Sequence, residues 1–341
     1  MIRCVLSSGY FTLTRERFRD VVDAVLEFTV VASFSRVGFI VRRWLYRWPA
    51  GFPTMNGAVV VVTGATSGLG REVAMSMAHL GAHVVLVVRD AERGQRTCDE
   101  IIARSGNSNV EVVVGDLGDF TSVSAAAEQL RRFGAIDVLA HNAGSLQHEL
   151  ERSPQGIELT VAVHLLGPYL LTRLTMPQLE AGNARIIWVT SGGMYSQPLD
   201  VDALATGLAK YDGVATYARV KRAQVSLVAR WAPRLASRGI EMEAMHPGWA
   251  DTPGVQRSLP SFRRVMAPLL RSSVEGADTI IWLATSRGAR EPGGLWLDRR
   301  SRRLHRLART RRSDSTRERE RLEEYCSSTT GFGDNGELPD W

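Results

Sequence analysis

The chain has 341 residues, of which 44% are hydrophobic and 23% charged, and its formal net charge is +6. This composition is typical of a globular protein with one sizeable core, and it excludes a disordered or fibrous chain. The three cysteines, Cys4, Cys98 and Cys326, have no Cys-x-x-Cys spacing, so we predict neither a disulfide framework nor a metal site. Such cysteine usage indicates a reducing compartment, and we expect a cytoplasmic protein.

Residues 1–53 form an N-terminal leader. It lacks the roughly 20 uncharged apolar residues that a membrane-spanning helix needs, because Glu27, Arg36 and Arg42 interrupt the best candidate. Residues 34–48 instead predict an amphipathic helix, with apolar residues and Trp on one side and arginines on the other. Two interpretations stay open: the helix lies on a membrane surface, which would make the protein membrane-associated, or it packs on the rest of the protein.

Residues 54–298 alternate short apolar runs with helix-length segments. We predict strands near 58–63, 83–88, 110–114, 136–140, 184–190, 240–246 and 294–298. Strands that are apolar nearly throughout are buried on both faces, and crossover helices make neighbouring strands parallel. The predicted fold is α/β: one doubly wound, Rossmann-type parallel sheet of about seven strands, with helices on both faces.

A glycine-rich turn joins the first predicted strand to the helix that follows. Glycines there permit a tight turn and a close approach of the backbone to a phosphate, and the N-terminus of the helix favours the negative charge. A glycine triplet alone is weak evidence, but here strand, turn and helix are in register. We therefore predict a dinucleotide-binding site made by Thr63, Gly64, Thr66, Ser67, Gly68, Leu69 and Gly70.

The end of the second strand predicts which dinucleotide binds. An acidic residue there would bind the ribose hydroxyls of NAD, whereas an arginine suits the 2′-phosphate of NADP. Arg89 occupies this place, so we predict NADP(H), although Asp90 follows and is also placed to cap the next helix. The next two strand ends should line the same cofactor site with Asp116, Leu117, Asn142, Ala143 and Gly144.

Tyr217 and Lys221 lie four positions apart on a predicted helix, and therefore on one face of it. Hydride transfer to a carbonyl leaves an alkoxide that needs a proton. A tyrosine can exchange this proton near neutral pH if its pKa of about 10 is lowered, which a nearby ammonium would do. Ser191 ends a strand at the same sheet edge, where its hydroxyl can hold the substrate oxygen. These residues predict an oxidoreductase that interconverts an alcohol and a carbonyl.

The loop after the sixth predicted strand should contact the nicotinamide through Pro247, Gly248, Trp249 and Thr252. The following segment, up to Leu270, carries several large apolar side chains and should cover a largely apolar substrate pocket. We therefore predict a small, lipophilic substrate.

These motifs, which extend from residue 57 to residue 298, resemble those of the short-chain dehydrogenase/reductase family. The stretch 88–94 resembles the retinol-dehydrogenase-type members, which implies NADP(H). The resemblance implies that Tyr217 is the general acid/base and that Lys221 binds the nicotinamide ribose and lowers the tyrosine pKa. It further implies that Ser191 orients the carbonyl, that Thr252 holds the carboxamide, and that the protein forms a dimer or a tetramer.

One position departs from the family pattern. Where the family usually has an asparagine that holds a water next to the lysine, this chain has His164. A neutral histidine can also hold a water, but its reach and titration differ. The alternative hypothesis is therefore a sensor or scaffold protein that binds NADP(H) without turnover. The complete Ser-Tyr-Lys set favours the enzyme.

Residues 299–341 form an arginine-rich tail, a composition that could indicate nucleic acid binding. However, no aromatic residues are interspersed among the arginines of 299–306, and residues 317–324 mix both charges. We expect no nucleic acid partner, and predict a tail that is solvated or lies at the mouth of the substrate pocket.

Overall fold

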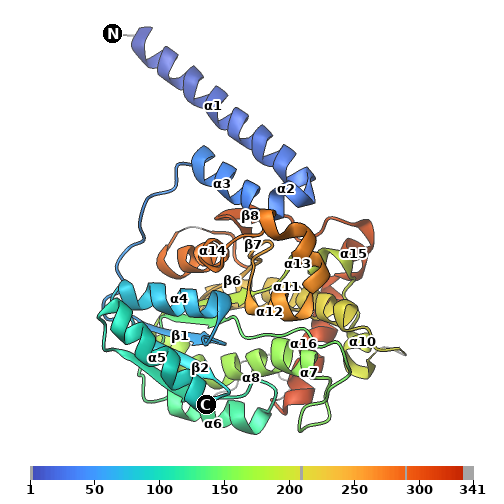
Figure 1. Ribbon diagram of the computed structural model, residues 1–341. Helices are drawn as coiled ribbons and strands as arrows, with labels where there is room; N and C mark the ends of the chain where they lie inside the picture. Colours follow the sequence, from blue (N-terminus) through green and yellow to red (C-terminus); the bar gives the residue numbers. More distant parts are fainter. Residues whose placement is uncertain (1–2, 208–209, 289, 333–341) are drawn as a thin grey trace.

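The computed structural model describes residues 3–207, 210–288 and 290–332, with side chains from residue 16 onward. In this part of the chain eight strands form one sheet, in the order β3-β2-β1-β4-β5-β6-β7-β8 (Figure 1). Neighbouring strands are parallel from β3 to β7, and β8 is antiparallel to β7. The strands are β1 (Val59–Thr63), β2 (His83–Val88), β3 (Val110–Val114), β4 (Val138–His141), β5 (Arg185–Val189), β6 (Glu241–Met245), β7 (Leu295–Leu297) and β8 (Arg300–Arg302).

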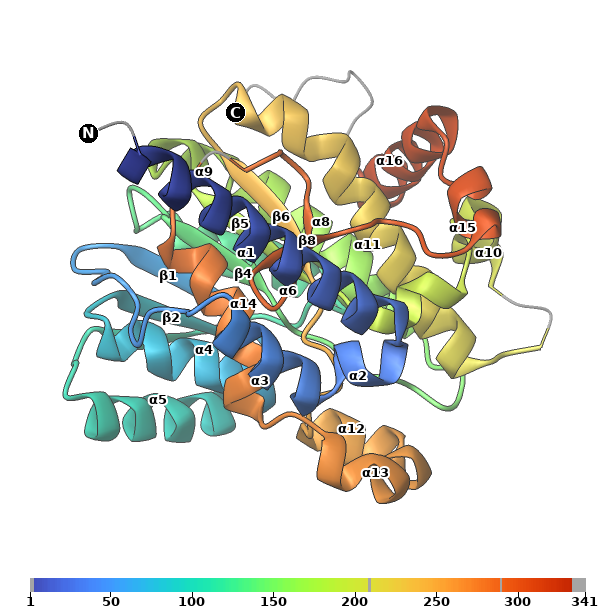
Figure 2. The same cartoon turned by 90° about the horizontal axis from the view of Figure 1, so that it is seen from above.

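Helices cover both faces of the sheet, because the side chains of each strand alternate between two apolar cores (Figures 1 and 2). In β1, Val60 and Val62 belong to one core and Val61 to the other, and all three are fully buried. The first core is covered by α4 (Gly68–His79), α5 (Ala91–Ser105) and α14 (Ser273–Thr285). The second is covered by α6 (Phe120–Leu130), α8 (Gly167–Leu174) and α11 (Gly213–Ala236). The predicted doubly wound α/β fold is confirmed.

Short helical elements lie in the connections between these layers. They are α9 (Met176–Ala181), the 3₁₀ turn η2 (Gly192–Ser196), α10 (Val201–Thr206), α12 (Pro253–Ser258), α13 (Pro260–Met266) and the 3₁₀ turn η3 (Ala267–Leu269). Two further elements, α7 (Leu159–Val161) and the π-helical turn η1 (Ala162–Leu166), continue directly into α8.

Residues 300–330, the described greater part of the predicted tail, belong to the folded domain. Strands β7 and β8 form a hairpin whose turn residues, Asp298 and Arg299, have φ angles of 54° and 56°, as a type I′ turn requires. After α15 (Ala308–Ser313), α16 (Thr316–Thr330) packs on α11, with Leu322 and Cys326 fully buried. The expectation of a solvated tail is therefore wrong for residues 300–330, because α16 has an apolar side that α11 covers.

The leader packs on the domain through α2 (Val30–Phe34), α3 (Arg36–Leu45) and the C-terminal part of α1 (Arg3–Phe28), where Asp23 pairs with Arg302 and Glu27 with Arg306. The rest of α1 extends beyond the domain (Figure 1). The single helix predicted over 34–48 is interrupted at Ser35, whose backbone is extended (ψ 175°). Phe34, Phe39 and Leu45 are buried in this contact, so packing on the protein's own domain is the interpretation that the structure supports for them. Within the described ranges, the hydropathy of every helix is too low, or its length too short, for it to span a bilayer.

Candidate active site

The glycine-rich turn between β1 and α4 is too tightly packed to hold side chains. Gly64 has a φ of +66°, and a Cβ there would lie 2.6 Å from the Cα of Ala143. A Cβ on Gly70 would lie 2.5 Å from the carbonyl oxygen of Gly64. Because both positions exclude a side chain, α4 begins directly against the turn and the backbone of the turn can approach a bound group closely.

Thr63, the last residue of β1, joins the turn to the end of β4. Its Oγ1 accepts hydrogen bonds from the backbone N–H groups of Asn142 and Ala143, both at 3.0 Å. The Asn142 side chain donates from Nδ2 to the carbonyl oxygens of Thr63 (3.1 Å) and Gly64 (3.3 Å). The structure thus places Thr63, Gly64 and Asn142 at one edge of the sheet. The Asn142 amide stabilises the glycine-rich turn through its two hydrogen bonds.

The first turn of α4 has the properties of an anion site. Thr66, Ser67 and Leu69 are half-buried here. In the described chain the Ser67 side chain makes no capping hydrogen bond to α4, so the first N–H groups of the helix have no side-chain cap. Thr252 lies opposite, because a Cβ on Gly68 would be 3.4 Å from its Cβ. The Thr252 hydroxyl accepts from the Val255 N–H (3.3 Å) and caps α12.

The end of β2 lies directly beside the turn, because the Gly64 N–H donates to the Val87 carbonyl at 3.0 Å. Arg89 follows two residues later and its side chain is exposed. Asp90 caps α5 by accepting from the Arg93 N–H at 2.9 Å. An exposed guanidinium beside the glycine-rich turn can bind a phosphate group.

Asp116 and Leu117 form the turn after β3. The Asp116 carboxylate accepts from the Gly118 N–H at 2.8 Å, and Leu117 is buried. A Cβ on Gly167 would overlap the Leu117 carbonyl, so α8 packs directly against this turn. The pair therefore lies in the same layer of strand ends as the glycine-rich turn.

Ser191, Tyr217 and Lys221 come together where β5 ends against α11. The Ser191 hydroxyl lies close enough to the Tyr217 phenol to oppose the rise of its pKa, and it accepts from the Gly193 N–H at 3.2 Å. Lys221 is 3% exposed, and its Nζ donates to the Val189 carbonyl at 2.8 Å. The same Nζ lies 5.4 Å from the centre of the Tyr217 ring. A phenol is thus held between a hydroxyl and an amine.

The protonation states differ from the prediction. Burial raises the pKa of Tyr217 to about 12, against a smaller opposing effect of the Ser191 hydrogen bond. Burial also lowers the pKa of Lys221 to about 7. The prediction that Lys221 lowers the Tyr217 pKa is therefore wrong for the protein by itself, because desolvation of both groups disfavours the phenolate and the ammonium.

His164 lies in the π-helical turn η1, with its ring edge-on to Tyr217 at 5.4 Å between centres. Its Nε2 is within hydrogen-bond distance of both the N–H (3.0 Å) and the carbonyl oxygen (2.8 Å) of Ser145. Among the described residues its buried Nδ1 has no partner. Burial, and to a smaller extent the charge of Lys221, hold the pKa of His164 well below its usual value, so the ring is neutral.

The ring of His164 also explains Gly144. A Cβ at position 144 would overlap the imidazole ring, so any larger residue at this position of the Asn142-Ala143-Gly144 segment would displace the ring of His164. The segment, the histidine and the tyrosine are therefore packed together.

The predicted nicotinamide loop runs from Pro247 to Thr252 and leads into the segment predicted to cover the substrate. Trp249 packs edge-on against Phe262 of α13, with 5.3 Å between ring centres. The Ser258 hydroxyl donates to the Leu146 carbonyl at 3.2 Å, so α12 contacts the loop that follows β4. Residues 249–270 thus form a bridge from the β6 loop to the β4 loop.

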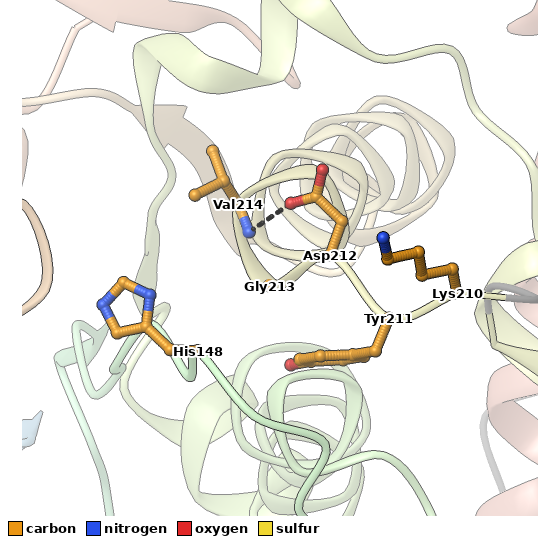
Figure 3. A pocket seen from close by; sticks show the side chains of 6 residues that line it. All are labelled: His148, Lys210, Tyr211, Asp212, Gly213 and Val214. Carbon is orange, nitrogen blue, oxygen red and sulfur yellow. Dashed lines mark hydrogen bonds between the residues drawn. The ribbon is translucent and has the colours of Figure 1, made fainter.

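A hollow of about 500 Å³ lies at the N-terminal end of α11 (Figure 3). The described residues that line it do not include Ser191, Tyr217 or Lys221. Val214 is in its wall, three positions before Tyr217 and thus on the same side of the helix. Among the described residues, the lining consists of His148, Lys210, Tyr211, Asp212, Gly213 and Val214.

Sequence patterns did not identify three buried residues that support this site. Phe34 of the leader, Arg271 and Asp298 are buried behind the Ser191 and Trp249 loops. Arginine and aspartate are rarely buried unless they are paired. The sequence alone does not show that Arg271 and Asp298 pair.

Comparison with known proteins decides the family. The family model described as short chain dehydrogenase matches residues 58–261, which contain every candidate of the glycine-rich turn and the Ser-Tyr-Lys set. The chain belongs to the short-chain dehydrogenase/reductase family. The predicted family membership and the predicted oxidoreductase class are therefore confirmed.

Two curated members of this family illustrate the likeness. The chain is 39% identical to dehydrogenase/reductase SDR family member 12 of Bos taurus over 268 residues, or 78% of this chain and 84% of that protein. It is 33% identical to retinol dehydrogenase 12 of Bos taurus over 244 residues, or 70% of this chain and 77% of that protein.

Two solved structures share the family fold. One is a 3-ketoacyl-(acyl-carrier-protein) reductase from Brucella melitensis complexed with NADH (26% identity, TM-score 0.58, 71% of this chain and 96% of that chain). The other, from Beutenbergia cavernae, contains NADP (28% identity, TM-score 0.57, 68% of this chain and 91% of that chain).

Proposed function

We propose that this protein is an NADP(H)-dependent oxidoreductase that interconverts an alcohol and a carbonyl on a small, lipophilic substrate. The observation that carries the proposal is the Tyr217 phenol, which lies beside the Ser191 hydroxyl and has the Lys221 Nζ 5.4 Å from the centre of its ring. This group lies at the sheet edge that also carries the glycine-rich turn, where ligands of doubly wound folds bind.

The residues of the turn fit a dinucleotide. Gly64 and Gly70 leave no room for a Cβ, and the first turn of α4 is without a side-chain cap among the described residues. Gly68 and the start of α4 would hold the pyrophosphate, and Asp116 and Leu117 the adenine end. A bound nicotinamide would supply or accept the hydride. Lys221, Asn142 to Gly144 and Pro247 to Thr252 would hold its ribose and ring.

The chain itself supplies the proton chemistry. In the reductive direction the Tyr217 hydroxyl donates its proton to the substrate oxygen that acquires negative charge, and the Ser191 hydroxyl donates a hydrogen bond to the same oxygen. The resulting phenolate is stabilised by the nearby Lys221 once that amine is protonated. His164, with its unpaired Nδ1, is placed to hold a water that reprotonates the pair.

Arg89 supports NADP(H) over NAD(H). Its exposed guanidinium follows the strand end that touches Gly64, where a 2′-phosphate would lie. The similar structures do not decide between the two, since one contains NADP and the other NADH.

The substrate proposal rests on residues 249–270 and on the hollow beside α11. The apolar side chains of Trp249 and Phe262 pack together in this covering segment, and Val214 places the hollow on the Tyr217 side of α11. The apolar part of a lipophilic substrate would pack against this covering segment. The resemblance to a protein named retinol dehydrogenase 12 supports an alcohol of this kind.

The test is a panel of lipophilic ketones and alcohols assayed with NADPH or NADP⁺ at the cofactor absorbance band. Tyr217→Phe should lower turnover by about 10²-fold or more, while the Kd for NADPH changes little. A Tyr217→Phe variant with the full rate would show that the phenol is not the acid/base.

The competing function is a sensor or scaffold that binds NADP(H) without turnover, and the observation that favours it is His164 in place of the usual asparagine. It predicts NADPH binding with no activity on any member of the panel, in the wild type as well as in Tyr217→Phe. Measurable wild-type turnover that Tyr217→Phe abolishes would exclude it.

We also propose that the leader contacts an anionic membrane surface. Phe18, Val21, Val25 and Phe28 of α1 and Val37, Ile40 and Trp44 of α3 are exposed at helical spacings. Exposed arginines at positions 17, 43 and 47 accompany them, and apolar side chains next to arginines are suited to anionic lipid. Vesicles with phosphatidylserine should bind the protein, and the double substitution Phe28→Ala, Trp44→Ala should weaken binding. Val114→Ala, at an exposed position of β3, is the control; equal binding by all three proteins would contradict the proposal.

Location and assembly complete the proposal. Cys98 and Cys326 are free and buried, which suits a cytoplasmic protein. The family relationship supports a dimer or tetramer, which sedimentation velocity would measure directly. A monomer at working concentration would exclude the oligomer.

A further inference from the structure

The end of α2 lies between two loops of the candidate active site. Phe34 is only 3% exposed, and its ring covers Gly192 so closely that a Cβ on that glycine would overlap it. The ring also contacts His246 and Trp249, with 4.7 Å and 5.9 Å between ring centres. Gly192 follows Ser191 directly, and Trp249 belongs to the predicted nicotinamide loop. One phenyl ring from the leader therefore supports both loops.

The backbone of the leader makes a second set of contacts with the β6 loop. The Trp249 N–H donates to the Phe34 carbonyl at 2.8 Å. Gly248 has a φ of +71°, and a Cβ there would lie 2.5 Å from the same carbonyl oxygen. The backbone of Phe34 and the backbone of residues 248–249 thus lie in direct contact, which fixes the position of the β6 loop.

Arg271 connects the leader to the segment that covers the substrate site. It is 1% exposed, and its guanidinium donates to the carbonyl oxygens of Ser33 (2.9 Å) and Phe34 (3.0 Å). Its own backbone N–H donates to the Trp249 carbonyl at 2.8 Å, and its carbonyl accepts from the Asp251 N–H at 2.8 Å. Both ends of the covering segment therefore meet at the leader.

We propose that Phe34 is a positioning residue of the active site: the leader holds Ser191 and the base of the 249–270 segment in their working geometry. The inference rests on the proposed oxidoreductase function for its kinetic consequence. Displacement of reacting groups by about 1 Å can cost roughly 10²-fold in rate. Without residues 33–35 the Gly192 face, His246 and Trp249 would lose the group that packs on them. The leader therefore contributes to the geometry of the active site, in addition to its exposed residues.

The test compares Phe34→Ala and the milder Phe34→Leu with Phe133→Ala. Phe133 is also buried, but its ring packs on His83 at the opposite edge of the sheet, 5.2 Å between ring centres. Each variant is measured for kcat and KM, for the Kd of NADPH, for thermal unfolding and for hydrogen exchange by mass spectrometry.

We expect Phe34→Ala to lower kcat by roughly tenfold to a hundredfold, with a smaller change in the Kd for NADPH, because the contacts of Phe34 given above reach the Trp249 loop and leave the glycine-rich turn in place. Hydrogen exchange should accelerate in residues 190–197 and 247–271 and stay unchanged in residues 58–90. Phe34→Leu should restore most of the rate, and Phe133→Ala should lose stability with kcat unchanged.

The hydrogen-exchange result separates this inference from the proposed function. A wild type without turnover would refute the proposed enzyme, while local acceleration in the two loops of Phe34→Ala would still support the positioning role. If exchange changes uniformly, or if Phe34→Ala and Phe133→Ala lose kcat equally, the inference is overturned. Should Phe34→Ala fail to fold, hydrogen exchange of Phe34→Leu decides: acceleration confined to residues 190–197 and 247–271 supports the inference, and a uniform or absent change overturns it.

Discussion

Arg42 of the leader and Asp298 of the β7–β8 turn form an ion pair inside the protein, with 2.7 Å between Nη1 and Oδ2 and side-chain exposures of 0% and 1%. The Asp298 carboxylate also binds both terminal nitrogens of Arg271, at 2.5 Å and 2.9 Å. A single carboxylate therefore joins the leader, the hairpin and Arg271, which directly follows the 249–270 segment. The segments meet only in the folded protein, since their positions lie far apart in the chain.

The first prediction concerns the stability that this pair confers. Arg42→Ala leaves Asp298 and the Ser33 carbonyl with one donor fewer in a buried place, so the free energy of unfolding should fall by about 3–5 kcal/mol. Arg36→Ala removes an ion pair whose arginine is 57% exposed, and it should cost less than about 1 kcal/mol. Urea unfolding of the two variants measures both values, and equal losses would contradict the assignment.

The glycine-rich turn predicts a difference between two glycines that both have positive φ. Gly64→Ala places a Cβ 2.6 Å from the Ala143 Cα, whereas a Cβ on Gly57 (φ +78°) meets nothing within 4 Å. Gly57→Ala should therefore show only the backbone cost, about 1 kcal/mol. Gly64→Ala should cost more and weaken NADPH binding. Titration of NADPH fluorescence checks this, and retained affinity in Gly64→Ala would argue against the turn as the pyrophosphate site.

Lys221 predicts a particular pH dependence of stability. Its pKa is about 7 in the folded protein because of burial, below the ordinary value of 10.5, so between these values the unfolded chain binds a proton that the folded chain does not. The free energy of unfolding should therefore rise with pH across this window, with a contribution of up to about 1.4 kcal/mol per pH unit, and this contribution ends below pH 7. Lys221→Met should remove the slope. Urea unfolding at pH 7.5 and 9.5 measures it, and identical slopes in the two proteins would contradict the neutral amine.

The sequence predicted the sheet well because its signals are local. Continuous runs of Val in β1 and of Val and Leu in β2 mark these strands, and the helix-length segments between strands leave parallel pairing as the arrangement. The glycine-rich turn and the Tyr217–Lys221 spacing each lie within one element and its neighbour. Their convergence then follows from the rule that parallel strands end at one edge.

The features that sequence did not predict depend on contacts between distant segments. Nothing in the periodicity around Phe34 indicates that it packs on Gly192, because the helical pattern specifies a face and not a partner. The pKa values of Tyr217 and Lys221 differ from expectation for a related reason. A spacing of four residues brings the two groups together. It does not determine how strongly burial desolvates each group, and this desolvation sets the two pKa values.

Arg89 predicts the choice between the two nicotinamide cofactors. If its exposed guanidinium binds the 2′-phosphate, Arg89→Ala should raise the Kd for NADPH by about tenfold or more, as the loss of a charge-assisted contact does, with little change for NADH. Arg96→Ala is the control, because Arg96 lies on α5 with its side chain 69% exposed. Equal Kd values for NADPH in the wild type and Arg89→Ala would remove the argument for NADP(H).

His164 predicts how the Tyr217–Lys221 pair exchanges protons with solvent. Its pKa lies well below the usual value, so the ring stays neutral and should add no step near pH 6.5 to the profile of kcat. His164→Leu removes the unpaired Nδ1 while keeping an apolar side chain beside Tyr217, and kcat should fall by about tenfold or more with the Kd for NADPH nearly unchanged. His164→Asn retains a polar group at this place and should keep most of the rate. If the Leu variant were as fast as wild type from pH 6 to 9, protons would have to reach Lys221 by a route that does not use residue 164.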